Sequence, residues 1–574
     1  MAGISFLLLI LQYRHDYMKK LLLMPLLLIL ASCSNVPEGT ALFWGSTNVS
    51  YNQNEKPAVI DGEAFMSPAW KGEKIAAEAV LWTETDITDA TVSVGCVRNG
   101  LKCIPSDNIE ISFAKYVMSD GFQEGYGQCG FRNKADFDSL LVADMLGDPF
   151  MEKIDGKSCQ PIWLSIKVPH DAVHGTYKGS VKLVSAEGTQ KLPFSFEVVD
   201  RILPEPSEWK YHLDLWQNPY SVARYHGVEP WSEEHFRYME PVMKILAEAG
   251  QKVITTTILD RPWNGQTEDA FGSMVTKTLK ADGSWEYGYE VFDKWVEFMM
   301  GLGIDRQISC YSMIPWHLEF DYIDEADGKM KTIKADPTSG EYRSYWSSFI
   351  SDFADHLREK GWYEMTVIAM DERPEDQMKA ALEVIHSVQP DFKVSLAGNW
   401  HESLESNLYD YCIAFRQDYP EGILEKRKNE GKVSTVYTCC AERYPNTFMA
   451  SPHAEAVWIP WYVLSKGYDG YLRWAYNSWT ADPVSDARFR AWPAGDCYMV
   501  YPDGRSSIRM EKLIEGIQDY EKALIIIERW ENEGNMDRLS AIEECLSVFT
   551  YENLTENGAE EAVLKAKTEV LHAY

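Results

Sequence analysis

Basic residues are scarce in this sequence of 574 residues. It has 55 lysine and arginine residues against 87 aspartate and glutamate residues, which gives a formal net charge of −32. A surface that binds nucleic acid or anionic lipid headgroups needs clustered positive charge, so this balance argues against both as ligands. We expect the charge to keep a secreted protein soluble.

Cysteines are also few, with 11 in the chain. None combines with histidine at the spacing of a zinc site, so we expect no metal and no other cofactor. In an oxidising compartment, Cys96 with Cys103 and Cys129 with Cys159 are the nearest candidates for disulfides. The adjacent pair Cys439-Cys440 is more typical of two buried thiols than of a redox switch.

Only one long apolar run is evident, Leu21–Leu30, which follows Lys19-Lys20 and precedes Cys33. It is short for a bilayer span, and a basic region, an apolar core and small residues before a cysteine are typical of a secretory signal. The ending Leu30-Ala31-Ser32-Cys33 resembles a bacterial lipobox. We expect residues 1–33 to be a lipoprotein signal with a lipidated Cys33. The mature protein would then be lipid-anchored in the bacterial envelope, at the outer membrane, facing the periplasm or the surface.

We expect several domains, because a chain of 574 residues is too long to fold around a single hydrophobic core. Residues 34–202 alternate apolar and polar residues between turns, which predicts a β-sandwich. The linker Leu203–Pro206 follows. Residues 203–495 then repeat strand, loop and helix, which predicts a (β/α)8 barrel of the triosephosphate isomerase type. Residues 496–574 are expected to be mostly helical. The eight expected barrel strands are Tyr211–Trp216, Val253–Leu259, Ile308–Met313, Thr366–Met370, Phe392–Ala397, Tyr411–Phe415, Val433–Thr438 and Gly470–Ala475.

The fourth of these strands ends at two adjacent carboxylates, Asp371 and Glu372. Active sites of such barrels lie at the carboxyl ends of the strands, and cleavage of a glycosidic bond commonly uses a pair of carboxylates. Asp371 could instead cap the next helix, with Glu372 and Pro374 in its first turn.

Aromatic and amide residues follow the ends of most of the other strands. Such a ring predicts an apolar cup with a few polar anchors, although packing inside the barrel explains each residue equally well on its own. The candidates for sugar contact are Trp216, Trp263, Asn399, Trp400, Tyr437, Trp474 and Tyr476.

Three stretches together resemble glycoside hydrolase family 123. They are the Asp-Glu pair after Val367–Met370, the segment Trp216–Phe236 (WQNPYSVARYHGVEPWSEEHF) and the segment Tyr501–Ile525 (YPDGRSSIRMEKLIEGIQDYEKALI). The resemblance implies an exo-acting β-N-acetylgalactosaminidase that removes terminal β-linked N-acetylgalactosamine from glycans such as glycosphingolipid oligosaccharides. It also implies retention of configuration, with the 2-acetamido group of the substrate as the nucleophile and an oxazolinium intermediate.

The resemblance also implies a role for each acid. Glu372 would protonate the leaving group and then activate water, and Asp371 would hold the acetamido N–H. By their positions at strand ends, Tyr437 is expected to donate to the acetamido oxygen and Trp474 to form the floor under the sugar. Two alternatives stay open. One is a retaining glycosidase whose nucleophile is a second carboxylate such as Asp260 or Asp410, and the other is a non-catalytic, lipid-anchored glycan-binding protein.

Overall fold

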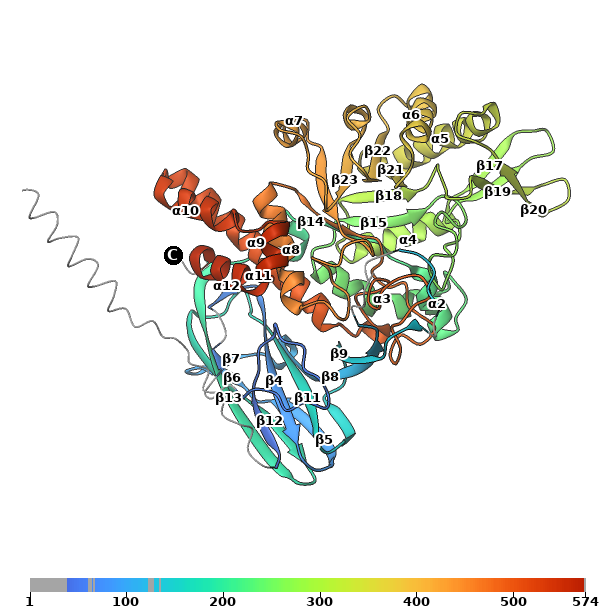
Figure 1. Cartoon of the computed structure of the whole chain (residues 1–574). Coiled ribbons are helices and arrows are strands. Elements are labelled where there is room, and N and C mark those ends of the chain that lie inside the picture. The colour runs from blue at the N-terminus through green and yellow to red at the C-terminus, as the bar shows by residue number, and fades with distance from the viewer. Residues whose placement is uncertain (1–38, 60–63, 66–67, 122–128, 134–135, 572–574) are drawn as a thin grey trace, which may run out of the picture.

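The computed structural model of the protein describes residues 39–59, 64–65, 68–121, 129–133 and 136–571 (Figure 1). The expected signal segment 1–33 and its lipidation site Cys33 lie outside these residues. None of the described helices is both long enough and apolar enough to cross a membrane.

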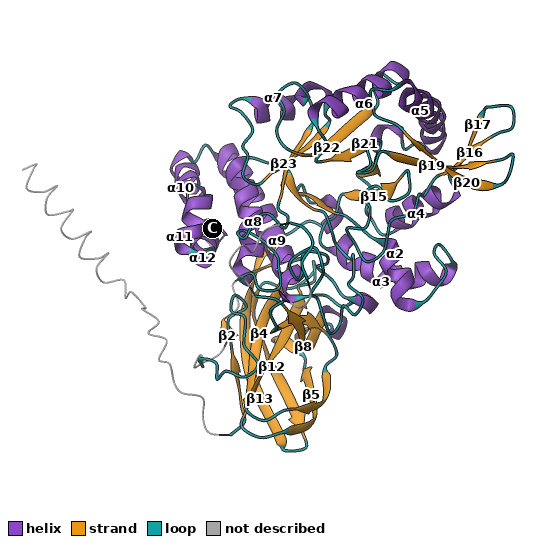
Figure 2. Cartoon of the chain, turned by 45° about the vertical axis from the view of Figure 1, so that its right-hand side comes forward, coloured by secondary structure: helices purple, strands orange, loops and turns teal. Residues whose placement is uncertain are grey.

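Two mainly antiparallel sheets form the N-terminal part of the molecule (Figure 2). Alternate residues of their strands point inward and share one apolar core, as expected for a sandwich. The first sheet has the order β1 (Ala41–Trp44), β4 (Lys74–Thr83), β11 (Ser158–Lys167), β8 (Ile109–Ser119) and β9 (Leu140–Leu146). The second has the order β10 (Phe150–Ile154), β5 (Ile87–Val94), β12 (Gly175–Ser185), β13 (Gly188–Ile202) and β2 (Ala64–Phe65), with β3 (Ala69–Lys71), β6 (Val97–Asn99) and β7 (Lys102–Ile104) attached.

Eight parallel strands form a nearly closed barrel, and each overlaps one of the eight expected strands. Parallel strands that are buried on both faces have continuous apolar sequences, which is why their positions could be predicted from the sequence. In ring order they are β14 (His212–Leu215), β25 (Gly470–Arg473), β24 (Val433–Tyr437), β23 (Asp410–Ala414), β22 (Lys393–Gly398), β21 (Thr366–Asp371), β18 (Gln307–Tyr311) and β15 (Val253–Thr257).

Helices cover the outside of the barrel between most of these strands. The connection between β22 and β23 holds only a single 3-10 turn, Glu405–Asn407. The helices of this part are α2 (Pro219–His226), α3 (Glu233–Glu248), α4 (Glu290–Gly301), α5 (Gly340–Lys360), α6 (Glu375–Val388), α7 (Ile423–Asn429) and α8 (His453–Lys466).

The ring is open between β14 and β15, and two glutamine side chains bridge the gap. Gln251 accepts a hydrogen bond from the Leu215 N–H (3.0 Å) and donates one to the Val253 carbonyl (2.7 Å). Gln217 accepts one from the Thr255 N–H (2.8 Å). Because buried backbone groups need partners, these amides replace the missing ladder.

A small four-stranded sheet, separate from the sandwich and the barrel ring, projects from the barrel. The sequence analysis did not predict it. Its strands come from the connections that follow β15 and β18, at the carboxyl ends of these barrel strands, and lie far to the right in Figure 1. Their order is β17 (Trp285–Gly288), β16 (Thr276–Leu279), β19 (Glu319–Asp324) and β20 (Lys329–Lys334).

The C-terminal part is helical, as expected, and it packs on the barrel through α8. Its long helix begins after Ser507, whose hydroxyl accepts a hydrogen bond from the Met510 N–H (3.0 Å). One apolar cluster includes residues of both the barrel and these helices. The exact limits 34–202, 203–495 and 496–574 therefore stay predictions. The helices are α9 (Ile508–Glu533), α10 (Met536–Leu546), α11 (Tyr551–Asn557) and α12 (Glu560–Ala566).

Candidate active site

The end of β21 brings both adjacent carboxylates to one pocket. Successive side chains of a regular strand point to opposite faces, so a straight strand would separate Asp371 from Glu372. Glu372 instead has a φ of 41°, in the left-handed region, while its N–H donates to the Ala397 carbonyl (2.7 Å). This change of backbone direction turns both side chains toward the mouth of the barrel.

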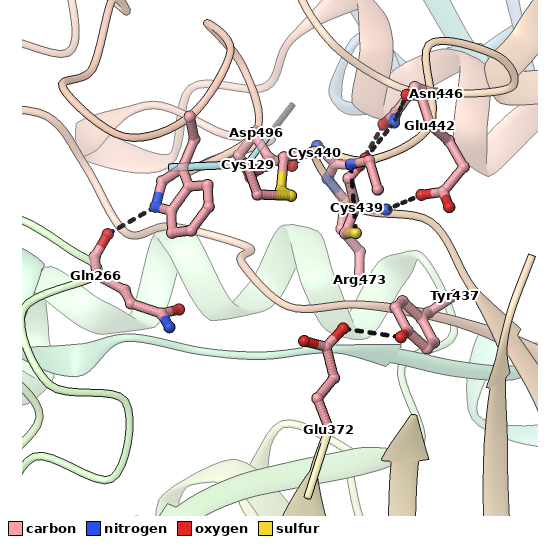
Figure 3. Close-up of a disulfide and its surroundings, with 12 residues drawn as sticks. Cys129, Gln266, Glu372, Tyr437, Cys439, Cys440, Glu442, Asn446, Arg473 and Asp496 are labelled. Atoms are coloured by element: carbon pink, nitrogen blue, oxygen red, sulfur yellow. Dashed lines mark hydrogen bonds and ion pairs between the residues drawn. A yellow bond between two sulfur atoms is a disulfide. The ribbon is translucent and has the colours of Figure 1, made fainter. Parts of the chain in front are cut away.

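The pocket lies at the carboxyl ends of the barrel strands, which is where the sequence analysis expected it. Asp371 and Glu372 are its only carboxylates among the described residues. Figure 3 shows Glu372 pointing from its strand end toward Tyr437, with a disulfide nearby. The lining residues are Cys129, Trp216, Trp263, Gln266, Trp316, Asp371, Glu372, Ala397, Tyr437, Cys439, Cys440, Leu472, Trp474 and Trp492.

The two carboxylates have different surroundings. Asp371 is only 8% exposed, and its Oδ1 has no hydrogen-bond partner within the described part of the chain. Burial raises the pKa of Asp371 to about 7, against the opposing influence of Arg373, and the charge of Glu372 adds to the rise. Glu372 is exposed to the pocket mouth, where its Oε1 accepts a hydrogen bond from the Tyr437 hydroxyl (2.8 Å). The indole groups of Trp316 and Trp263 are close enough to lower the pKa of Asp371. The site thus combines a buried carboxylate, whose Oδ1 has no hydrogen-bond partner in the described structure, with an accessible acid.

An aromatic surface forms one side of the pocket. The rings of Trp216 and Trp263 stack with centroids 5.0 Å apart, and Tyr311 packs against both. Trp474 and Trp492 meet edge to face at 5.7 Å. Such walls suit the apolar faces of a sugar ring.

The structure brings together four of the seven predicted contact residues. Trp216, Trp263, Tyr437 and Trp474 line the pocket with the two acids. Their strand-end positions were therefore a sound guide to the geometry, whereas contact with a sugar stays a prediction.

Asn399, Trp400 and Tyr476 do not line the pocket, so the predicted geometry is wrong for them. Asn399 is exposed and its Oδ1 accepts a hydrogen bond from Gln417 (2.6 Å), while Trp400 stacks on Tyr411 at 5.2 Å. Tyr476 is fully buried and its hydroxyl donates to the Val242 carbonyl (2.7 Å). Beyond the end of a strand the two-residue alternation no longer fixes direction, which explains these errors.

Several lining residues were not among the predicted contacts. Trp316 follows the third barrel strand, so its strand-end position was a usable signal, and its ring lies 4.7 Å from the Arg373 guanidinium. Gln266 and Trp492 lie in long connections, far from any strand end in sequence. They meet through a hydrogen bond from the Trp492 indole to the Gln266 carbonyl (2.8 Å).

The cysteines are paired differently from one of the two expectations. Cys96 and Cys103 form the expected disulfide. Cys129 pairs with Cys440 and not with Cys159, which is a buried free thiol, so that pairing was wrong. The view of Cys439-Cys440 as two buried thiols fails as well. Closeness in sequence misled here, because the bonded residues are 311 positions apart.

The alternative nucleophiles lie elsewhere. Asp410 starts β23, at the opposite end of the barrel, where it accepts a hydrogen bond from Gln307 (2.8 Å). Asp260 accepts one from the Ser273 N–H (3.0 Å) and is not part of the pocket lining.

Comparison with known protein families gives matches over most of the chain. The family model described as "Glycoside hydrolase 123, catalytic domain" matches residues 216–526, and that described as "Glycoside hydrolase 123 N-terminal domain" matches residues 44–185. Comparison with the curated proteins gives no match.

Solved structures were compared as well. A family 123 glycoside hydrolase from Clostridium perfringens, described in terms of glycolipid glycan hydrolysis, is 27% identical with a TM-score of 0.83, over 93% of this chain and 98% of that one. The β-glucuronidase 3 of Bacteroides uniformis is 11% identical with a TM-score of 0.28, over 79% of this chain and 51% of that one. Because the catalytic-domain model alone matches more than half of the sequence, the chain belongs to glycoside hydrolase family 123 and is a glycoside hydrolase.

Proposed function

We propose that this enzyme is an exo-acting, retaining β-N-acetylgalactosaminidase that uses the acetamido group of its substrate as the nucleophile. The main support is that Asp371 and Glu372 are the only carboxylates among the described residues of the pocket. A mechanism with a protein nucleophile needs a second carboxylate across the sugar, about 5 Å from the acid. Two neighbouring acids at one strand end suit a reaction in which the substrate supplies the nucleophile.

In the proposed first step, the acetamido oxygen attacks the anomeric carbon while Glu372 gives its proton to the departing oxygen. The bond to the leaving group breaks and an oxazolinium ion forms. Tethering the nucleophile to the sugar gives it a high effective concentration. In the second step Glu372 removes a proton from water, which attacks the anomeric carbon and restores the acetamido group with net retention.

Asp371 is proposed to accept the acetamido N–H. Its buried Oδ1 lacks a donor within the described chain, so a substrate N–H would satisfy it. Positive charge grows on this nitrogen as the oxazolinium ion forms. A fixed, desolvated carboxylate therefore stabilises the transition state more than the bound substrate.

Tyr437 and Trp474 are proposed to position the sugar. The Tyr437 hydroxyl, 2.8 Å from Glu372 Oε1, is close enough to the acid to serve the acetamido oxygen once substrate enters. Trp474 would lie under the ring, with Trp216 and Trp263 as further walls.

A panel of 4-nitrophenyl β-glycosides tests the proposal. We expect the N-acetylgalactosaminide to be the best substrate and the matching galactoside, with a 2-hydroxyl group, to react at least a thousandfold more slowly. Similar kcat/KM values for the two would favour a protein nucleophile. Preference for the N-acetylglucosaminide would overturn the galacto assignment and leave the assisted mechanism in place.

We further propose that the mature enzyme is anchored in the bacterial envelope through a lipidated Cys33, its only contact with membrane. The support is the basic, apolar and small-residue order of the leader. Metabolic labelling with a palmitate analogue should mark the wild type and not Cys33→Ala. Equal labelling of both would contradict the anchor.

A further inference from the structure

A segment of the N-terminal part reaches the rim of the barrel. The end of β8 pairs with the loop after β25, because the Met118 N–H donates to the Ser485 carbonyl (2.9 Å). Further along, the Gly130 N–H donates to the Ala491 carbonyl (3.3 Å). Arg132 donates to the carbonyl of Trp492, a pocket residue, over 2.7 Å. Residues 129–132, which we name the rim segment, thus lie beside the polypeptide that carries Trp492.

A disulfide fastens the rim segment to the barrel. Cys129 of this segment is bonded to Cys440, in the connection after β24, and both cysteines line the pocket (Figure 3). The disulfide is therefore part of the lining of the same pocket that holds the two carboxylates.

The barrel side of this disulfide is held by other bonds. The Asn446 side-chain amide donates to the carbonyls of Cys439 and Glu442, each at 2.8 Å. Asn446 in turn accepts a hydrogen bond from Arg473 (2.7 Å), which is fully buried and paired with Asp496. Opening the disulfide would therefore leave the barrel loop in place and release Cys129, while Gly130 and Arg132 keep their bonds to Ala491 and Trp492.

The reacting groups also do not depend on the disulfide. Asp371 ends β21, which is hydrogen-bonded to strands on both sides. Tyr437 ends β24 and is in register with Ala414 on one side and Leu472 on the other. Loss of the bridge should change how the sugar is enclosed and leave the acid and the acetamido acceptor in place.

We propose that the rim segment is a wall of the sugar pocket supplied by the N-terminal part, and that the Cys129–Cys440 disulfide is its positioning element. This inference rests on the proposed glycosidase function, because it assigns the wall to the same pocket. The rim segment then sets how tightly the substrate is bound, and the barrel sets how fast it reacts.

The test is the double variant Cys129→Ser/Cys440→Ser, with Cys96→Ser/Cys103→Ser as the matched control. The control removes the other disulfide, whose cysteines are both exposed and do not line this pocket. With 4-nitrophenyl β-N-acetylgalactosaminide, we expect the first variant to raise KM at least fivefold with kcat within twofold of wild type. Both constants should stay at wild-type values in the control. Unchanged KM in the first variant, or KM and kcat altered together, would overturn the positioning role.

An activity-free readout separates this inference from the proposed function. Hydrogen–deuterium exchange should rise in peptides covering 129–133 and 489–494 of the first variant, and not in those covering 366–372. Peptide mapping of unreduced wild type should recover Cys129 linked to Cys440; a link to Cys439 would contradict the assignment. If the wild type cleaves none of the aryl glycosides, the proposed function is wrong. Unchanged exchange in residues 129–133 of the first variant would contradict the proposed wall whether or not the proposed function holds.

Discussion

At the residue scale, the site depends on the backbone of Glu372. A left-handed φ in a residue with a side chain costs roughly 1–3 kcal/mol, and such residues cluster at functional sites. Here it places two neighbouring carboxylates in one pocket, one buried and one exposed. The sequence predicted the pair, because an apolar run that stops at two acids is a local pattern. It could not predict their different burial, which depends on the walls around them.

The burial of Asp371 predicts opposite effects of one substitution on stability and activity. Between pH 3.8, its ordinary pKa, and about 7, only the folded chain retains this proton, so the free energy of unfolding falls as pH rises. Above pH 7 that loss is complete. Asp371→Asn should therefore be more stable than wild type at pH 8, by up to about 4 kcal/mol, in urea unfolding. It should also lose more than a hundredfold in kcat.

Glu372→Gln provides the comparison for this substitution. Because Glu372 is exposed, we expect much less stabilisation than for Asp371→Asn, together with a loss of nearly all hydrolysis. Equal stability of Asp371→Asn and wild type at pH 8 would contradict a buried Asp371 carboxylate with a raised pKa.

The raised pKa of Asp371 also predicts how kcat/KM falls at acidic pH. Asp371 must be ionised to accept the acetamido N–H, and its pKa in the free enzyme is about 7. We expect kcat/KM to fall about tenfold per pH unit as pH decreases below 7. Initial rates from pH 4 to 9 measure this limb. A limb with its midpoint near pH 4 would contradict the raised pKa of Asp371.

At the scale of elements, the parallel strands were predictable and their surroundings were not. All eight barrel strands appear as apolar runs in the sequence, and the strand ends located four of the pocket aromatics. Tyr476 was misplaced because its direction depends on the Trp216 carbonyl, to which its N–H donates (2.9 Å). The sheet formed by β16, β17, β19 and β20 was missed because its strands are only partly buried and lack continuous apolar runs.

The open seam of the barrel predicts that one glutamine is important for stability. Gln251 is 2% exposed, and its loss would leave buried backbone groups of β14 and β15 without partners. Gln251→Ala should lower the free energy of unfolding by about 3 kcal/mol, measured by urea titration. Gln377→Ala, at a partly buried position on α6, should change it by less than about 1 kcal/mol. Equal effects of both would mean that the seam does not need the amide.

At the scale of the whole molecule, the N-terminal sheets meet the C-terminal helices through long-range polar contacts. Asp144 of β9 holds Arg509 of α9 in a bidentate pair, with both distances 3.0 Å, and both side chains are buried. Partners this far apart in sequence, like Cys129 and Cys440, have no local signature. This is why the sequence predicted the parts and not the way they join.

That buried pair predicts a large effect of a single truncation. Asp144→Ala would leave the Arg509 charge buried without its partner, and we expect a loss of about 3–5 kcal/mol in the free energy of unfolding. Asp200→Ala is the control, because Asp200 pairs with Lys71 while its own side chain is 75% exposed, and it should cost less than about 1 kcal/mol. A loss below 1 kcal/mol for Asp144→Ala would contradict the coupling of the two parts.

The participation of the substrate is tested most directly by varying the nucleophile itself. The measurement is kcat/KM for 4-nitrophenyl β-galactosaminides whose 2-acyl group carries zero, one, two or three fluorine atoms. If the acyl oxygen attacks the anomeric carbon, each fluorine weakens it, and kcat/KM should fall steeply, by more than a thousandfold across the series. A flat series would contradict the account, because it would mean that the acetamido group only binds.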